Sequence, residues 1–347
     1  MSSSPAVLEI KNLSLSFMIN GKPAYAVHSV NLTLHKGEIT ALVGESGCGK
    51  TMTALSCMGL QPQNAEVSGS VKLGQTELLS LTEKQWRSVR SSRISMVFQE
   101  PLTALNPLLK IKRQVTEGAV AHGMDKKAAE SRALELLAKT GLPAPRRIME
   151  CYPHQLSGGQ RQRIMIAAAM MDSPDIIIAD EPTASLDVTI QTQIMHLLKD
   201  LVHETDTALL IITHDLAMVR TMCTSVSVMY RGRIIESGSA DSVFGSPLHP
   251  YTRALLNSVP SAARSGKKLS AISGSVPALG TEEIYGCGFA GRCSECFLPC
   301  MNSQPQHVLI RAADGGEHMV ACWQYRQASD TADAAVVAES VSGERIQ

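Results

Sequence analysis

The sequence predicts an α/β fold in which short buried strands alternate with helices. Residues 39–43, 176–179 and 208–212 are apolar runs of strand length, and a polar residue or a glycine follows each of them. A glycine-rich turn joins the first run to a helical stretch, which is the order of a phosphate-binding loop. The turn consists of Gly44, Glu45, Ser46, Gly47, Cys48, Gly49, Lys50 and Thr51.

Length and charge narrow the protein class. The 347 residues suffice for one large domain and a smaller one. Lys plus Arg and Asp plus Glu both number 32, so no net charge attracts the chain to nucleic acid, and we expect no nucleic-acid partner. No apolar run approaches the roughly 18 residues of a membrane helix. The first residues show no secretory signal, which indicates the cytosol.

The elements follow in order along the chain. Residues 7–17 and 26–34 alternate apolar and polar positions, which predicts a small antiparallel sheet. Residues 94–98 form a buried strand that ends at Gln99, whose amide could ligate Mg²⁺ or hold a water molecule. Helical patterns dominate from about 101 to 169, with one amphipathic helix over 128–142.

A second phosphate-binding element is predicted at Leu156-Ser157-Gly158-Gly159-Gln160. Two glycines after a serine stand at the start of a helix expected over 160–171, where free N–H groups and the positive helix end suit a phosphate. Further on, Asp180 at a strand end could hold the Mg²⁺ shell, and Glu181 could accept a proton from water. His214 ends another strand and repeats this placement.

Together these strings resemble the nucleotide-binding subunit of an ATP-binding-cassette (ABC) transporter, over roughly residues 6–260. The resemblance implies a RecA-like core with an antiparallel β subdomain and a helical subdomain at about 101–169. It also implies that the Leu-Ser-Gly-Gly-Gln signature of one subunit closes on the MgATP held by another. The residues expected to contact ATP or Mg²⁺ are the eight of the glycine-rich turn with Thr53, Gln99, Ser157, Gly158, Gly159, Gln160, Asp180, Glu181, Ser185, Asp187 and His214, and either Phe17 or Tyr25 against the adenine.

Two further strings narrow the resemblance. Residues 100–107 and 249–256 are similar to segments of dipeptide and oligopeptide importers, a group that includes nickel importers. The resemblance implies a heterodimer with a second ATPase subunit, two transmembrane permease subunits and an external binding protein, at the cytoplasmic face of the cell membrane. Import of nickel or a metal complex is the alternative. A soluble ABC ATPase of DNA repair or translation is disfavoured by the short helical insert.

The C-terminal part differs in composition. The composition predicts a small domain over residues 261–326 that begins with a linker at 261–275. Residues 327–347 are predicted to be a disordered tail. Clustered thiolates can hold a soft metal. In the resembled peptide importers, cysteines at the spacing found over residues 287–322 are associated with a 4Fe-4S cluster. We therefore expect such a cluster here, with Zn²⁺ and an unmetallated loop as alternatives. The expected ligands are Cys287, Cys293, Cys300 and Cys322, while Cys296 is surplus.

Overall fold

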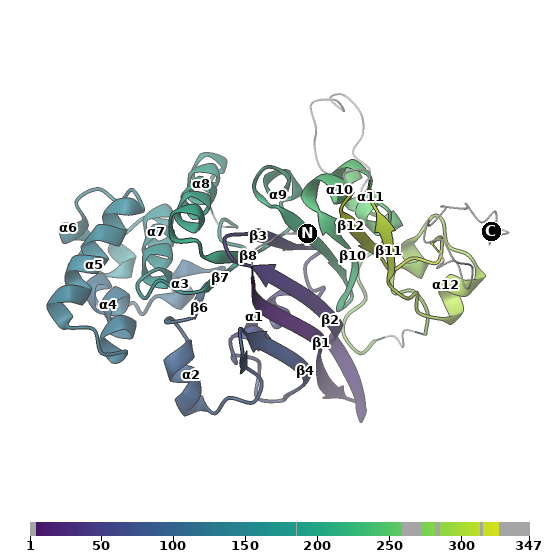
Figure 1. Ribbon diagram of the computed structural model, residues 1–347, viewed down its shortest axis with the longest axis horizontal. Helices are drawn as coiled ribbons and strands as arrows, with labels where there is room; N and C mark the ends of the chain where they lie inside the picture. Colours follow the sequence, from purple (N-terminus) through teal and green to yellow (C-terminus); the bar gives the residue numbers. More distant parts are fainter. Residues whose placement is uncertain (1–4, 185, 259–271, 282–284, 313–314, 326–347) are drawn as a thin grey trace.

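The computed structural model describes residues 5–184, 186–258, 272–281, 285–312 and 315–325. Two sheets organise them (Figure 1). A four-stranded sheet has the order β2-β1-β4-β5, and an eight-stranded sheet has the order β11-β12-β10-β9-β3-β8-β7-β6. The strands and helices expected from the sequence are therefore present, and the larger sheet continues into the C-terminal part of the chain.

The smaller sheet is antiparallel, as predicted. Its strands are β1 (Ala6–Ile19), β2 (Lys22–His35), β4 (Ala65–Leu73) and β5 (Thr76–Glu77). Asn20 and Gly21 both have positive φ angles, 52° and 75°, which is the backbone of a tight hairpin turn between β1 and β2. One face of this sheet buries apolar side chains that alternate along β1, such as Leu8, Leu13 and Leu15.

The core of the larger sheet is parallel. It contains β3 (Ile39–Val43), β6 (Ile94–Val97), β7 (Ile176–Asp180), β8 (Ala208–Thr213) and β9 (Ser225–Tyr230). Every residue of β3, β7 and β8 is buried, which explains why their sequences are almost entirely apolar. Parallel strands end at one edge of a sheet, so the residues that follow them are brought together there.

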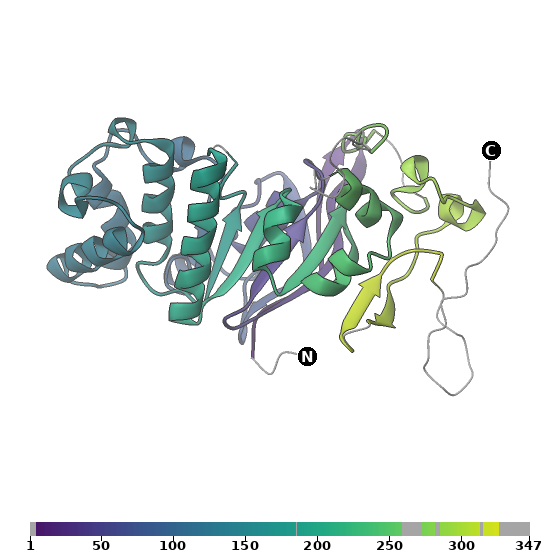
Figure 2. The same cartoon turned by 90° about the horizontal axis from the view of Figure 1, so that it is seen from above.

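Helices cover the sheet and extend beyond one end of it. Near the sheet lie α1 (Lys50–Cys57), α2 (Glu83–Val89), α8 (Val188–Thr205), α9 (Leu216–Met222), α10 (Ala240–Gly245) and α11 (Pro250–Ser258). The helical region at the left of Figures 1 and 2 holds α3 to α7. Its elements are α3 (Pro101–Ala104), α4 (Ile111–Ala121), α5 (Lys126–Lys139), α6 (Pro145–Met149), η1 (Pro153–Gln155) and α7 (Gly158–Ala169).

The boundaries of two helices differ from the expected ones. Helix α5 starts at Lys126 rather than at residue 128, because the Asp125 side chain accepts hydrogen bonds from the N–H groups of Lys127 and Ala128. It ends before Gly141, whose φ of 73° leaves the helical region. Helix α7 starts at Gly158 instead of residue 160, so both glycines of the signature lie inside its first turn.

The C-terminal segment, which is the part of the chain after α11 and is described over residues 272–281, 285–312 and 315–325, adds two strands to the larger sheet. Strand β10 (Arg233–Ser239) pairs with β12 (Glu317–Val320), which pairs with β11 (Val308–Arg311). Two short helices, η3 (Ala290–Arg292) and α12 (Leu298–Asn302), lie at the right of Figure 1. The sequence did not indicate this β-hairpin. Most of the expected linker and all of residues 327–347 lie outside the described residues.

The buried join between these strands is polar. Glu236 of β10 is fully buried and accepts hydrogen bonds from the backbone N–H groups of Leu248 and His249, at 2.7 and 2.9 Å. A nitrogen of the His318 ring, Nε2, lies 2.8 Å from the same carboxylate. A buried carboxylate needs such partners, so Glu236 ties β10, β12 and the start of α11 together.

Among the described residues, the structure contains no helix that is both long and apolar enough to span a bilayer.

Candidate functional site

The glycine-rich turn leaves β3 and enters α1 with its backbone tightly held. Gly44, Gly47 and Gly49 have φ angles of 154°, 78° and 109°, which other residues rarely adopt. A Cβ atom on Gly49 would lie 2.3 Å from the carbonyl oxygen of Ala26. The sequence can form this loop because glycine stands where the backbone turns and where β2 approaches it.

Lys50 lies within the turn, and its side chain is directed back along it. The residue is only 5% exposed, and its Nζ donates to the carbonyl oxygens of Gly44 and Glu45 at 2.8 and 2.9 Å. These are partners that an anion with several oxygens could replace. The ammonium group is thus held at the mouth of the loop, where the sequence predicted a phosphate.

Asp180 ends β7 beside the loop and is 3% exposed. Burial raises the pKa of its carboxyl group, and a hydrogen bond from Thr51 opposes that rise. Its Oδ1 atom is buried and has no hydrogen-bond partner among the described residues. A buried carboxylate oxygen that lacks a partner fits a bound cation, and the oxygens of Thr51 and Asp180 are the ligand type that Mg²⁺ takes.

Three side chains from three different strand ends meet at Glu181. The Gln99 amide donates from Nε2 to Glu181 Oε2 at 3.3 Å, and His214 Nδ1 lies 3.2 Å from Glu181 Oε1. The Glu181 side chain is 17% exposed, whereas that of His214 is 66% exposed. Glu181 has a φ of 44°, an uncommon backbone conformation for a residue with a side chain. The carboxylate is therefore oriented from both sides at the edge of the sheet.

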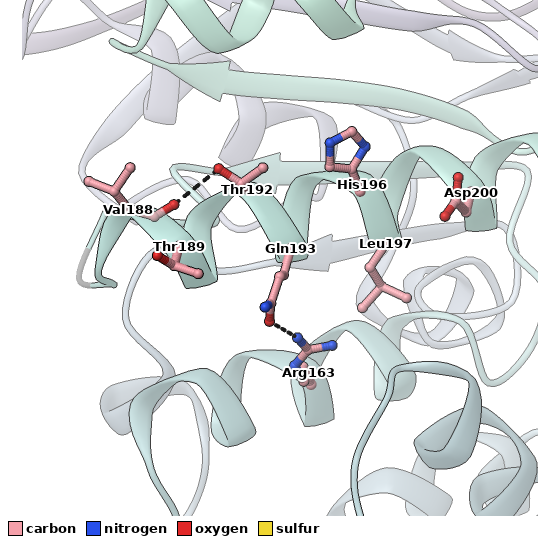
Figure 3. Close-up of a pocket in the computed structure, with 8 residues that line it drawn as sticks. All are labelled: Arg163, Val188, Thr189, Thr192, Gln193, His196, Leu197 and Asp200. Atoms are coloured by element: carbon pink, nitrogen blue, oxygen red, sulfur yellow. Dashed lines mark hydrogen bonds between the residues drawn. The ribbon is translucent and has the colours of Figure 1, made fainter.

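A cleft of about 380 Å³ opens next to these residues. It is lined by Gly44, Glu45, His214, Leu216, Leu255, Ser258 and Ile272. The glycine-rich turn, the end of β8 and α11 therefore border the same space. A second groove, between α7 and α8, is lined by side chains that include Arg163, Gln193 and His196 (Figure 3). Neither the phosphate loop nor the strand-end residues line it.

The signature lies at the N-terminus of α7. Ser157 accepts a hydrogen bond from the Gln160 N–H at 3.3 Å, and Gln160 Oε1 accepts one from the Ser157 N–H at 3.0 Å. This reciprocal cap fixes the helix start. Ser157 is exposed, and Gly158 lines a separate groove with Gln99, Pro101 and Leu186. The two phosphate-binding elements expected from the sequence therefore face different clefts of one chain.

The remaining expected residues are placed as follows. Phe17 is half-buried and packs against the core of the smaller sheet, whereas Tyr25 is 43% exposed. Thr53 is fully buried, and its hydroxyl donates to the Gly49 carbonyl oxygen at 3.1 Å. Asp187 caps α8 by accepting from the Ile190 N–H at 3.0 Å. Ser185 lies outside the described residues.

Two residues that the sequence analysis did not assign to the site contact the phosphate loop. The Tyr251 hydroxyl accepts a hydrogen bond from the Glu45 N–H at 2.9 Å. Arg292 forms an ion pair with the Glu45 carboxylate at 2.6 Å. Tyr251 stands in the string 249–256, which was singled out only by resemblance. Nothing in the sequence around Arg292 indicated a partner 247 positions earlier.

Comparison with known proteins defines the family. A family model described as "ABC transporter" matches residues 27–184, and one described as "Oligopeptide/dipeptide transporter, C-terminal region" matches residues 235–300. The chain is 45% identical to the oligopeptide transport ATP-binding protein AppD of Bacillus subtilis, over 92% of this chain and 97% of that protein. The chain belongs to the ABC transporter family. Within this family it is an ABC ATPase of the oligopeptide/dipeptide group.

Other relatives and solved structures agree. The chain is 43% identical to the oligopeptide transport ATP-binding protein OppD of Lactococcus lactis subsp. cremoris, over 87% of this chain and 89% of that protein. A solved dimeric ATP-binding cassette in a post-hydrolysis state, bound to ADP and Pi, is 30% identical. It superposes with a TM-score of 0.60 over 67% of this chain and 98% of the other. The cassette fold expected from the sequence is confirmed.

Two expectations for this ABC ATPase are wrong. No group of three or more His, Cys, Asp or Glu side chains in the described part of the chain could hold a metal ion, which overturns the 4Fe-4S cluster and its Zn²⁺ alternative. Cys287, Cys293, Cys300 and Cys322 instead line one pocket whose other lining residues include Phe289, Glu295 and Trp323. Burial raises the pKa of Cys293 to about 11 and of Cys322 to about 12, so these thiols stay protonated at neutral pH.

The second expectation that is wrong is the heterodimer with a different ATPase subunit. The relatives are named as peptide-transport ATP-binding proteins, and those names mention neither an iron–sulfur cluster nor a second, different ATPase subunit. The signature motif implies a partner cassette but contains no information about whether that cassette has the same sequence. Resemblance alone suggested a different one.

Proposed function

We propose that this chain is the ATP-hydrolysing subunit of an importer of dipeptides or oligopeptides. The observation that carries the proposal is the placement of Glu181 between Gln99 and His214, beside the phosphate loop. The match of residues 235–300 to the C-terminal region of oligopeptide and dipeptide transporters supports the substrate class. It also favours a transporter over a soluble ABC ATPase of DNA repair or translation.

Each residue of the site has a proposed role. Lys50 exchanges its two carbonyl partners for phosphate oxygens, and the N–H groups of residues 46–51 surround them. Thr51, Asp180 and Gln99 would hold Mg²⁺, which supplies positive charge against the phosphates. Glu181 accepts the proton of the attacking water, and His214 orients Glu181 and contacts the γ-phosphate. The exposed ring of Tyr25, or Phe17, packs on adenine.

The chain cannot complete this site alone under the proposal. The signature Ser157-Gly158-Gly159-Gln160, with the loop at 185–187, serves the ATP bound by a second cassette. The separate clefts of the two phosphate-binding elements support this arrangement. Two ATP molecules are then clasped between two cassettes, and closure is passed to membrane subunits at the cytoplasmic face of the membrane. We further propose a nucleotide-binding domain over residues 1–260 and a small regulatory domain over residues 261–326.

Substitution Glu181→Gln tests the chemical role. The amide keeps the shape and a hydrogen-bond acceptor but cannot take a proton, so we expect ATP turnover to fall by about 10²- to 10⁴-fold. Binding of MgATP should stay within about twofold, because Glu181 acts on water rather than on the nucleotide. Phosphate release and isothermal titration calorimetry on the purified full chain measure the two effects.

A carboxylate far from the site provides the control. Glu204→Gln removes an exposed charge on α8 that pairs with Lys139 at 3.2 Å, and should leave turnover unchanged. Wild-type turnover in Glu181→Gln would remove Glu181 from its role and leave the proposed chemistry without a base.

Transport assays separate peptide from nickel. The relatives named above are oligopeptide transport proteins, which favours a peptide cargo over a metal complex. With the permease subunits in liposomes, peptide-loaded binding protein should stimulate ATP hydrolysis and nickel should not. Stimulation by nickel alone would reverse the assignment of cargo and leave the ATPase assignment intact.

A further inference from the structure

Arg292 connects the C-terminal segment to the phosphate loop. It is the last residue of η3, and its guanidinium contacts both carboxylate oxygens of Glu45. Nη1 lies 2.6 Å from Oε2, and Nη2 lies 3.0 Å from Oε1. Two parallel charge-assisted hydrogen bonds fix the position of both groups as well as their distance. The second residue of the glycine-rich turn is thus held by a part of the chain outside the core of the cassette.

The ion pair is sheltered and supported from several sides. The Arg292 side chain is 9% exposed, and that of Glu45 is 26% exposed. The guanidinium also donates from Nε to the Ser273 carbonyl oxygen at 2.8 Å and from Nη2 to the Gly274 carbonyl oxygen at 3.2 Å. Its charged end lies 5.9 Å from the centre of the Tyr230 ring. Loss of one partner would leave the other charged group partly buried and uncompensated.

Glu45 is held at three points. Besides its carboxylate, its N–H donates to the Tyr251 hydroxyl at 2.9 Å, and its carbonyl oxygen accepts from Lys50 at 2.9 Å. Tyr251 is fully buried and packs against Tyr230 and Phe289, with ring centroids 4.6 and 5.3 Å away. Phe289 comes from the same segment as Arg292. When ATP takes over the Lys50 ammonium, the Tyr251 and Arg292 contacts remain to hold Glu45 in place.

We propose that Arg292 is a positioning residue for ATP binding, through which the C-terminal segment holds the phosphate loop in its binding conformation. A loop that is already ordered does not have to lose conformational freedom when the nucleotide binds. The proposal rests on the proposed function, in that the loop around Lys50 binds ATP. It adds that the segment after α11 sets the affinity, even though that segment lies outside the cassette core.

A second ion pair that involves the C-terminal segment provides the control. Arg253 of α11 pairs with Glu295 at 2.7 Å, and these side chains are 38% and 36% exposed. This pair also joins α11 to the C-terminal segment, yet neither residue touches the glycine-rich turn. An effect on general stability should follow from breaking either pair. An effect on nucleotide affinity should follow only from breaking the pair with Glu45.

The test measures MgATP affinity by calorimetry, together with the melting temperature, on full-length Arg292→Gln, Arg292→Lys and Arg253→Gln. We expect Arg292→Gln to weaken MgATP binding about tenfold and Arg253→Gln to change it less than about twofold. Arg292→Lys should recover part of the loss, because it keeps the charge but not the bidentate contact. Wild-type affinity in Arg292→Gln, or an equal loss in Arg253→Gln, overturns the proposal.

Two further variants make the result unambiguous. Tyr251→Phe removes the hydroxyl that accepts from the Glu45 N–H and keeps the ring, so it should weaken MgATP binding in the same direction even if Arg292→Gln fails to fold. Unchanged affinity in a folded Tyr251→Phe would count against the proposal.

Lys50→Ala distinguishes this inference from the proposed function. If Lys50→Ala neither weakens MgATP binding nor slows hydrolysis, the ATP site itself is wrong. Weaker MgATP binding in Lys50→Ala together with unchanged binding in Arg292→Gln defeats the inference alone.

Discussion

The two proposed phosphate-binding elements of this ABC ATPase, the glycine-rich turn and the signature, are built in opposite ways. The glycine-rich turn is held on every side: by β2 at Gly49, by Tyr251 and Arg292 at Glu45, and by its own Lys50. The signature is held only at the start of α7, by the reciprocal cap of Ser157 and Gln160, and its serine is exposed. The turn is enclosed by its own chain, whereas the signature is open. Under the proposed function, the turn binds nucleotide within one chain, and the signature acts only when a second cassette brings nucleotide to it.

The largest expected effect on ATP hydrolysis comes from a change in the glycine-rich turn. Lys50→Ala removes the ammonium group that the loop directs at the phosphates, so we expect ATP hydrolysis to fall by about a thousandfold or more and MgATP binding to weaken with it. Phosphate release and calorimetry on the same protein measure both. Retained binding with lost hydrolysis would mean that the loop alone binds ATP, and Lys50 would then act in the chemical step only.

The signature should separate binding from hydrolysis. Ser157→Arg places a bulky cation on the surface proposed to face a partner cassette, so we expect hydrolysis to fall by about a hundredfold while each chain still binds MgATP normally. Light scattering should show that this variant stays monomeric with MgATP under conditions where Glu181→Gln forms a dimer.

A conservative change at the same position is the control. Ser157→Ala removes the hydroxyl without adding bulk or charge, and loss of the cap should cost about 1 kcal/mol of folding stability. Normal turnover in Ser157→Arg would show that the signature does not close on nucleotide, and the difference between the two elements would lose its functional meaning.

Acid should destabilise the fold through His249, next to the tyrosine that supports the glycine-rich turn. His249 accepts the N–H of Tyr251 at 3.0 Å, and burial holds the pKa of His249 at about 4 against 6.5 for a free imidazole. As pH falls below about 6.5 the unfolded chain binds this proton and the folded chain does not, so stability that is complete above pH 6.5 is lost toward pH 4. Glu236 opposes the shift and Arg253 adds to it.

The expected loss between pH 7.5 and pH 5 is about 2 kcal/mol from His249. Urea denaturation of the wild type and of His249→Asn, which keeps an acceptor for Tyr251, measures it. The variant should lose about 2 kcal/mol less over this interval. Equal pH dependence in both proteins would show that His249 does not contribute to the loss of stability in acid.

Local sequence predicted the cassette core and missed what supports it. Short patterns predicted the loop at 44–51 and the strand ends at Asp180 and His214, because glycine placement and burial act over a few residues. They also predicted a helix after the signature serine, although the helix starts at Gly158 and not at the expected residue 160. The contact of Arg292 with Glu45 depends on how the segment after α11 returns to the core, which neither residue signals locally. The resemblance to peptide importers implied an iron–sulfur cluster at the cysteines, whereas in the structure four of the thiols line one pocket with Phe289 and Trp323.

Strand β12 has a practical consequence. It covers the outer edge of β10, where it forms the pairs Glu236 with Val320 and Ser237 with Met319. A shortened version of the chain that stops after α11 would leave this edge open, and uncovered strand edges recruit other strands. Such a fragment would self-associate without any nucleotide, so tests of ATP-dependent dimer formation require the intact C-terminus.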